Sequence, residues 1–334
     1  MPTQGKDNLH DRPFSLKDLV DTKEWQRIQD SFSSLMGLGL RTLDAKGELF
    51  TLPSGEPRLC RELKQDSTIR KKFCGCLPTF LGGKAVVDKN LGFTCGAGMQ
   101  SFVVPLRNNG WTLGYVIVGP VILVMRKPKD KYSNIAEELN LDAEDFWSAL
   151  LEIKIISFQS VQSLLELIKD IGEYTIKQAC ICLKHGKEMM MPIDSPKLNR
   201  MLNALLDVAF EVTGADIGSI MLKDEDKGEL RIHSSKGLTN EVIKNTRVKV
   251  GEGISGIAAK EGASFVIDDN IKDNRIKRHL NRPYINSSMV IPIKVEDKVW
   301  GVINLGALKT SSVRFGVDNV HLVNRLIDLA TVAF

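Results

Sequence analysis

The sequence predicts an α+β protein of two domains, each with a central antiparallel sheet flanked by helices, joined by a long connector helix. Three observations support this fold class. The chain has 334 residues, whereas a single domain most often has ~100–150. Both halves contain short apolar runs separated by turn residues, as is typical of antiparallel sheets. Between the halves, residues 160–184 lack proline and carry apolar residues at helical spacing.

Composition and charge exclude several classes of protein. With 43% hydrophobic and 26% charged residues, the chain matches ordinary globular proteins. Its formal net charge of +4 is too small to favour nucleic acid or an anionic membrane as a partner. Residues 1–11 are too polar for a signal peptide, and no run reaches the ~18 apolar residues of a membrane helix. We therefore expect a cytoplasmic protein, in which thiols stay reduced.

The order of these patterns predicts four segments. Residues 1–13 are polar and are expected to form a disordered lead. Residues 14–158 form the first domain. Residues 159–196 form the connector helix and a linker, whose end is marked by two closely spaced prolines. Residues 197–334 form the second domain.

The first domain is expected to open with helices followed by a hairpin. Residues 15–20 and 25–36 have amphipathic helical patterns. Two apolar runs, Leu38–Leu43 and Glu48–Leu52, flank the turn Asp44–Gly47. Asp and Gly at the ends of such a turn indicate two paired strands.

A second hairpin is predicted further along the first domain. Residues 101–107 and 111–118 flank Asn108-Asn109-Gly110, and Asn-Gly favours a tight turn because both residues tolerate positive φ. The apolar run Val116–Met125 contains Gly119-Pro120. It is therefore interpreted as two buried strands around a bend.

The connector carries one apolar stripe. Its members recur at about 3.6-residue spacing; they are Val161, Leu164, Leu165, Ile168 and Ile171. A helix of this length suits a connector or a two-stranded coil. The closing helix, from Asp318 onward, carries a similar stripe. We expect a homodimer through these two helices.

The second domain is predicted to begin with a helix over residues 197–213. Six strands follow, with hairpin turns at residues 226–228 and 296–298. The expected strands are Ile217–Lys223, Glu229–Ser234, Arg247–Val250, Ser264–Ile267, Ser288–Val295 and Val299–Ala307.

Four cysteines of the first domain lie close together in the sequence. Cys60, Cys74, Cys76 and Cys95 have the spacing C-x13-C-x-C-x18-C, and no histidine lies between residues 11 and 184. Four thiolates can hold zinc or an iron–sulfur cluster. The same cysteines can instead be buried, ligand-lining free thiols, or a redox sensor in which Cys74 and Cys76 form the local pair. The spacing leaves these three interpretations open.

Motifs around the cysteines resemble the PocR sensory domain over about residues 14–175. They are RLCREL, KKFCGCLPTF and GFTCGAGMQSFVVPLRNNGWTLGYVIVGPV. The resemblance implies a PAS-like fold that senses small organic compounds such as diols. Gly119-Pro120 departs from the Gly-Gln that is usual in the family. The predicted ligand-binding residues are Cys60, Cys76, Cys95, Met99, Phe102, Trp111 and Tyr115.

The second half resembles a GAF domain over residues 197–334, through the segments VGEGISGIAAKEGASFVIDDN and INSSMVIPIKVEDKVWGVINL. The resemblance implies a ligand cavity on one face of an antiparallel sheet. The predicted ligand-binding residues are Asp268, Asp269, Asn270, Arg275, Ser287 and Ser288. Since residues 197–334 contain no cysteine, thioether attachment of a bilin and methionine-sulfoxide reductase chemistry are excluded.

These features together predict a signal-transduction input protein without catalytic residues of its own. The first domain senses a small molecule, a redox state or a metal cluster, and the helix relays the change to the GAF domain. The alternative is the input half of a sensor histidine kinase in a two-component system, or of another output enzyme or transcription regulator. That hypothesis places an output module beyond residue 334, because no C-cap glycine or polar tail follows the closing helix. The expected partners are a small-molecule ligand, a second copy, and the output module or a partner protein.

Overall fold

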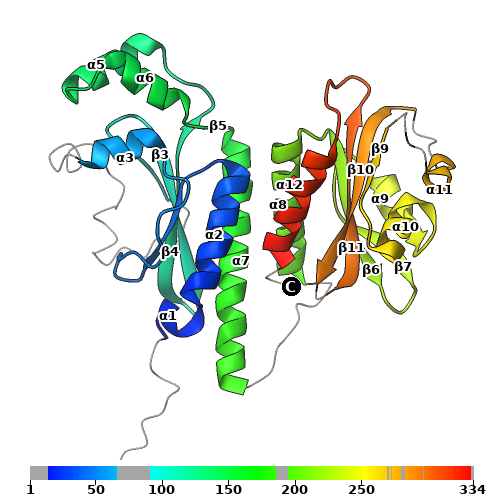
Figure 1. Ribbon diagram of the computed structural model, residues 1–334. Helices are drawn as coiled ribbons and strands as arrows, with labels where there is room; N and C mark the ends of the chain where they lie inside the picture. Colours follow the sequence, from blue (N-terminus) through cyan, green and yellow to red (C-terminus); the bar gives the residue numbers. More distant parts are fainter. Residues whose placement is uncertain are drawn as a thin grey trace, which may run out of the picture.

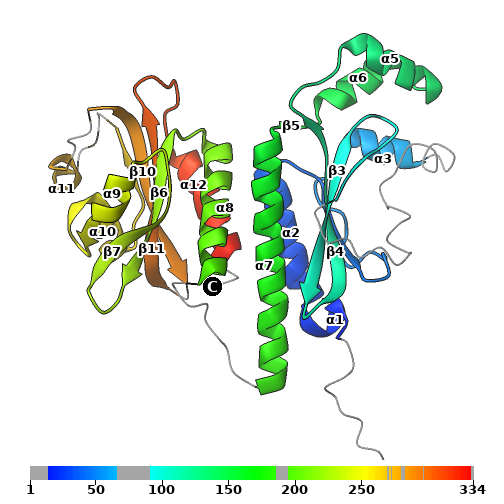
Figure 2. The same cartoon turned by 180° about the vertical axis from the view of Figure 1, so that it is seen from behind.

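The computed structural model describes residues 14–65, 91–185, 195–268, 271, 273–279, 283–295 and 297–331. It contains two antiparallel sheets with four helices standing between them, as Figures 1 and 2 show from opposite sides. The predicted α+β fold class is therefore confirmed. The four helices are α2 (Thr22–Met36), α7 (Phe158–His185), α8 (Pro196–Thr213) and α12 (Val317–Thr331).

The N-terminal sheet has the order β1-β4-β3-β2, and a short β5 pairs in parallel with the end of β4. The predicted Asn-Gly hairpin joins β3 to β4, with φ of 48° at Asn109 and 84° at Gly110. The strands are β1 (Leu40–Asp44), β2 (Leu91–Thr94), β3 (Gln100–Asn108), β4 (Trp111–Leu123) and β5 (Ile155–Ile156).

Two expectations for this sheet were wrong. The run Val116–Met125 is not two strands, because β4 continues past Gly119-Pro120 and keeps partners on both sides of that pair. Residues 48–52 form a single isolated bridge to β1, between Leu49 and Leu43. Side chains of α2 bond the backbone there instead: Gln26 accepts from Leu52 N–H, and Gln29 donates to Leu52 C=O.

Helices α2 and α7 cover one face of the N-terminal sheet, with the short α1 (Leu16–Leu19) beside them (Figure 1). Gln29 fixes α2 to the sheet because its buried amide oxygen accepts from the hydroxyls of Thr42 and Thr51, at 2.9 and 2.6 Å. Helices α3 (Arg58–Gln65), α5 (Lys129–Glu138) and α6 (Ala143–Leu151) enclose a separate apolar cluster.

The C-terminal sheet has the order β8-β7-β6-β11-β10-β9, with all pairs antiparallel. The six predicted strands are confirmed as β6 (Ile217–Asp224), β7 (Glu229–Lys236), β8 (Arg247–Lys249), β9 (Phe265–Ile267), β10 (Ile285–Val295) and β11 (Lys298–Leu308). Helices α8 and α12 lie on the face toward the N-terminal domain. Helices α9 (Asn240–Asn245), α10 (Gly253–Glu261) and α11 (Asn274–Lys277) lie away from it (Figure 2).

One apolar core runs through both domains. It includes Leu106 and Ile168 on the N-terminal side and Leu205, Ile303 and Leu326 on the C-terminal side, all nearly or fully buried. The predicted connector is confirmed as a single helix, α7, which packs on β3 and on α8. None of the helices in the described part of the chain, α7 included, is long and apolar enough to cross a membrane.

Candidate functional site

An apolar cavity of the C-terminal domain lies between its sheet and the helices α9 and α10. This cavity has a volume of about 230 Å³. Every described residue that lines it is uncharged. Its walls are mainly aliphatic, with Met221, Ile232, Val248 and Leu305 among them. The arrangement is that of a small-ligand cavity, in which apolar walls surround a few polar groups.

Three side chains form a polar centre in this cavity. Asn304 lies on β11 directly opposite Ser219 of the neighbouring β6, and Ser255 is in the first turn of α10. The Ser255 hydroxyl donates to Asn304 Oδ1 at 2.7 Å, and Asn304 Nδ2 donates to Ser219 Oγ at 3.2 Å. The chain of hydrogen bonds therefore crosses from one sheet strand to the other and on to the helix.

Of the residues predicted for this site, Ser288 lines the cavity and is buried. The adjacent Ser287 is also buried, but its hydroxyl accepts the Phe315 backbone N–H at 3.1 Å. Asp268 directly follows β9, while Asp269 and Asn270 lie outside the described residues. Neighbouring residues of a strand point to opposite faces of the sheet, so only one of the two serines reaches the cavity.

Arg275, also predicted for the site, belongs to a surface ion-pair cluster. Its guanidinium contacts Asp273 at 2.7 Å and pairs with Glu261. Hydrogen bonds from Arg275 lower the pKa of Asp273, and the Asp273 bonds in turn raise the pKa of Arg275. The side chain is half exposed and does not line the cavity. Its described contacts hold α11 to the end of α10.

Sequence reasoning missed Ser219, Ser255 and Asn304. One signal was available: Asn304 interrupts an otherwise apolar run, GVINLGAL, in a strand expected to be buried. A buried amide needs hydrogen-bond partners, so such a residue indicates a polar site. Its partners Ser219 and Ser255 are remote in sequence, and no local pattern joins them to it.

In the N-terminal domain, three of the predicted ligand-binding residues come together. Cys60 of α3 is buried in the same apolar cluster as Met99, and Cys95 packs against that cluster. A turn places Cys95, because its N–H donates to Met99 C=O at 2.9 Å and its C=O accepts from Gly98 N–H at 2.8 Å. Gly98 has a φ of 76°, which favours glycine.

The other predicted residues of this domain lie elsewhere. Phe102 is part of the core beneath α2 and α7, whereas Tyr115 belongs to a small cluster with Val103 and Ile117. Trp111, at the hairpin, is 63% exposed. Cys74 and Cys76 lie outside the described residues.

A pocket beside Cys60 holds only about 20 Å³ and is bounded by Arg41, Glu56 and Pro120, among others. The described residues contain no group of three or more side chains suited to a metal ion. They supply two thiols, Cys60 and Cys95, on one cluster. A tetrahedral site needs four ligands, so the fit of a metal depends on the two cysteines outside the described residues.

Helices α7 and α8 meet in a seam that joins the domains. At one end, the Ser160 hydroxyl donates to the Glu211 carboxylate at 2.5 Å, and the Ser163 hydroxyl donates to Asp207 at 2.9 Å. These bonds connect the start of α7 to the end of α8, so the two helices run antiparallel.

At the other end of the seam, the helices are joined by an ion pair and a cation–π contact. An Asp170 carboxylate oxygen lies 3.8 Å from the Arg200 guanidinium, and the Lys197 ammonium lies 5.4 Å from the centre of the Tyr174 ring. The Asp170 side chain is only 8% exposed, while that of Arg200 is 65% exposed. The pair is therefore buried on the side of α7 and open on the side of α8.

Successive contacts are three, seven and four residues apart along α7 and four, seven and three apart along α8, which fits a heptad pattern. That spacing places Leu167 and Ala204 in the middle of the seam, and both are buried. Within the chain, α7 thus packs antiparallel against α8. Homodimerisation through α7 and α12 remains a prediction.

Burial perturbs ionisable groups along this seam, Asp170, Glu173 and Lys197 among them. Desolvation raises the pKa of Asp170, although the nearby cations Arg200 and Lys197 oppose the shift. Desolvation likewise raises the pKa of Glu173 and lowers that of Lys197. In each case burial disfavours the charged form.

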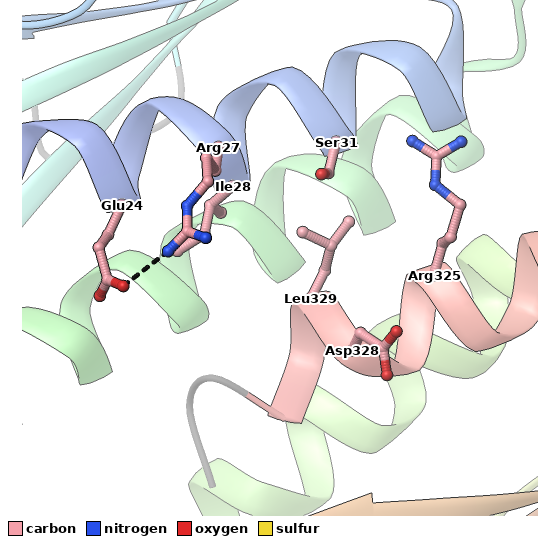
Figure 3. Close-up of a pocket in the computed structure, with 7 residues that line it drawn as sticks. All are labelled: Glu24, Arg27, Ile28, Ser31, Arg325, Asp328 and Leu329. Carbon is pink, nitrogen blue, oxygen red and sulfur yellow. Dashed lines mark hydrogen bonds and ion pairs between the residues drawn. The ribbon is translucent and has the colours of Figure 1, made fainter.

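The second contact between the domains is more open. Helices α2 and α12 border a groove of about 360 Å³. Figure 3 shows the charged side chains that both helices contribute to it, with Ile28 and Leu329 among the other lining residues. Glu24 and Arg27 of α2 form an ion pair at 2.7 Å, and both are largely exposed. The other lining residues are Ser31, Arg325 and Asp328.

Comparison with known proteins agrees with this division of the chain. The model of the sensory domain found in PocR matches residues 18–180, and the GAF domain model matches residues 196–334. The PocR match includes most of α7, so this helix belongs to the sensory domain as well as to the seam. The chain has no match among curated proteins.

Several solved structures are also similar. The GAF domain from an Acinetobacter phosphoenolpyruvate-protein phosphotransferase is 19% identical with a TM-score of 0.37, over 53% of this chain and 94% of that chain. The A. aeolicus nlh2 GAF domain in an inactive state is 22% identical with a TM-score of 0.31, over 52% of this chain and 97% of that chain. The free methionine-R-sulfoxide reductase from Neisseria meningitidis is 16% identical with a TM-score of 0.37, over 54% of this chain and 92% of that chain.

The strand orders and the family matches define the class of protein: a tandem sensory chain with a role in signal input. Residues 18–180 contain a sensory domain of the kind found in PocR, and residues 196–334 contain a GAF domain.

Proposed function

We propose that this chain detects a small-molecule signal in its PocR domain and relays it through α7 to the GAF domain, whose cavity takes a second ligand. The observation that carries the proposal is the double contact of α7. One side of this helix packs on the PocR sheet, and another packs on α8 of the GAF domain. A rigid helix shared by two domains transmits a displacement from one to the other.

The contact of α7 with the PocR sheet is close. Gly172 lies so near to β3 and α2 that an added methyl group would stand 2.5 Å from Leu106 Cδ2 and 3.3 Å from Trp25 Cη2. Leu106 is completely buried, and Trp25 is nearly so. Such packing has little room to absorb movement, so a shift of the sheet moves the helix.

The contact of α7 with the GAF domain includes specific polar groups. The hydrogen bonds from Ser160 and Ser163, together with the Asp170–Arg200 pair, fix the position of α8 along α7. A ligand shifts the equilibrium only if it binds one arrangement of this seam more tightly than another. The seam is therefore the element that couples the two sites in our proposal.

Hydrogen–deuterium exchange of a Gly172→Ala variant tests the relay without a known ligand. The added methyl group pushes α7 away from β3, so we expect faster exchange in α8 as well as in α7. Strands β10 and β11 should keep their wild-type protection, which separates this effect from general loss of stability. Glu166→Ala, at an exposed position of α7, is the control. Unchanged exchange in α8 would contradict the relay.

Zinc or an iron–sulfur cluster on the four cysteines is a further part of the proposal. Its support is the shared location of Cys60 and Cys95 in one apolar cluster. The test is elemental analysis and a visible spectrum of protein purified without oxygen. Cys60→Ser should lower metal content and stability together, whereas Cys182→Ser, at an exposed cysteine of α7, should change neither. Metal-free, colourless protein would rule out both kinds of site.

A further inference from the structure

The size and lining of the GAF cavity restrict the kind of ligand that it can bind. Resting on the proposed ligand role of this cavity, we propose that it selects a small uncharged molecule with one or two hydrogen-bonding groups and rejects organic ions. Three observations carry the proposal: the volume of the cavity, the absence of charge from its described lining, and the polar centre at Asn304.

The volume limits the size of the ligand. At about 230 Å³ the cavity is smaller than the ~300–1,000 Å³ of sites that hold drug-sized molecules. A tetrapyrrole or a nucleotide is too large for it. The ligand is therefore a compact molecule, of the size of a single substituted ring or a short branched chain.

The lining decides the charge of the ligand. The described lining residues are aliphatic side chains, glycines, methionines, hydroxyls and one amide, with no cation to pair with an anion and no carboxylate to pair with a cation. An ion that loses its water without gaining a partner pays a large desolvation cost. Hydroxyls and an amide compensate a neutral polar group far better than an ionised one. The described walls therefore favour neutral ligands over charged ones.

The polar centre supplies the specific contacts. An amide side chain has two N–H donors and an oxygen that accepts two hydrogen bonds. The described bonds use one donor and one acceptor position of Asn304, with Ser255 and Ser219 as partners. Both serines and Asn304 line the cavity. Hydrogen-bonding capacity is therefore left over at one point of an otherwise apolar space, which matches a ligand with a single polar end.

The inference is tested with a fragment library that contains neutral, anionic and cationic molecules of about ten non-hydrogen atoms, including matched amide–carboxylate pairs. Binding is detected by ligand-observed NMR with the full chain and with Val242→Trp. Val242 of α9 lines the cavity yet is 44% exposed, so a larger side chain there blocks the cavity at little cost in folding. Val317→Trp, at a 67% exposed valine of α12, is the matched control.

We expect a set of fragments whose binding is lost in Val242→Trp and kept in Val317→Trp. Nearly all of them should be neutral, and each carboxylate should bind at least about tenfold more weakly than its amide, which corresponds to ~1.4 kcal/mol. Asn304→Leu, checked for an unchanged unfolding midpoint, should weaken the amides and spare the purely apolar fragments. Charged fragments that bind as well as neutral ones would overturn the inference while leaving the proposed ligand role intact. No cavity-dependent binding at all would overturn both, but not the relay through α7.

Discussion

The two helix pairs that join the domains differ in how they are packed. The α7–α8 pair forms a continuous seam, with buried Leu167 and Ala204 in its middle and hydrogen bonds or ion pairs toward its ends. The α2–α12 pair borders a groove of about 360 Å³ and presents exposed charges such as Glu24 and Arg325 to it. The same two domains thus share one tight contact and one open contact.

This difference bears on the relay that we propose. A packed seam resists deformation because every displacement breaks contacts, whereas an open groove can widen or narrow at small cost. Movement of the domains about α7–α8 would therefore change the width of the groove at α2–α12. The predictions below test that contrast, beginning with the change that should have the largest effect.

Truncation of a buried side chain in the middle of the seam should lower the free energy of unfolding the most. Leu167 is fully buried, so Leu167→Ala should lower the free energy of unfolding by about 2–5 kcal/mol, the usual cost of such a cavity. Leu183→Ala makes the same chemical change at a 60% exposed position of the same helix and should cost less than about 0.5 kcal/mol. Chemical denaturation measures both. Equal losses would show that the seam is not packed as described.

Substitution of Asp170, at the charged end of the seam, should raise the free energy of unfolding, by less than Leu167→Ala lowers it. Burial raises the pKa of Asp170 in the folded protein above its ordinary value of 3.8. Protonation therefore favours the folded state: the contribution is most favourable below that ordinary value and is lost as pH rises through the raised pKa. At neutral pH the buried carboxylate costs stability. Asp170→Asn removes this cost, because the partner Arg200 is largely exposed and keeps its hydration.

Asp170→Asn should accordingly raise the unfolding midpoint at neutral pH by about 1–2 °C, which corresponds to ~1 kcal/mol for a chain of 334 residues. It should also flatten the pH dependence of that midpoint above the ordinary carboxyl pKa. Asp328→Asn, at an exposed position of α12, is the control and should leave both unchanged. Calorimetric scans at a series of pH values provide the measurement. A lowered midpoint in Asp170→Asn would mean that the Arg200 pair outweighs desolvation.

Charges at the open groove should matter least. Glu24 and Arg27 form an exposed pair, and exposed pairs contribute ~0–1 kcal/mol. We expect Glu24→Ala and Arg325→Ala each to change the free energy of unfolding by less than about 0.5 kcal/mol. Denaturation at low and high salt checks this, since any contribution should be screened. A loss comparable to that of Leu167→Ala would remove the contrast between the two contacts.

Local chemistry made much of the fold predictable from sequence. The hairpin at Asn109-Gly110 depends on two adjacent residues, and the stripe of α7 depends on regular spacing within one helix. The strand predicted at residues 48–52 is absent because side chains of α2 form hydrogen bonds with that backbone. A hairpin pattern in the local sequence does not take such distant bonds into account. The polar centre of the cavity was missed because it joins three remote segments. At the PocR site, Cys60, Cys95 and Met99 meet, while Trp111 remains exposed.

The apolar core that runs through both domains has a consequence for how such a protein is inherited. Modules that touch only through polar surfaces can be exchanged between genes without loss of stability. Here α8 and α12 bury residues such as Leu205 and Leu326 in a core that they share with α7. Separating the domains would leave apolar helical faces in water, where they invite aggregation or new partners. Recombination that replaces one domain must therefore also supply a matching helical face, so the pair should be transmitted as one unit.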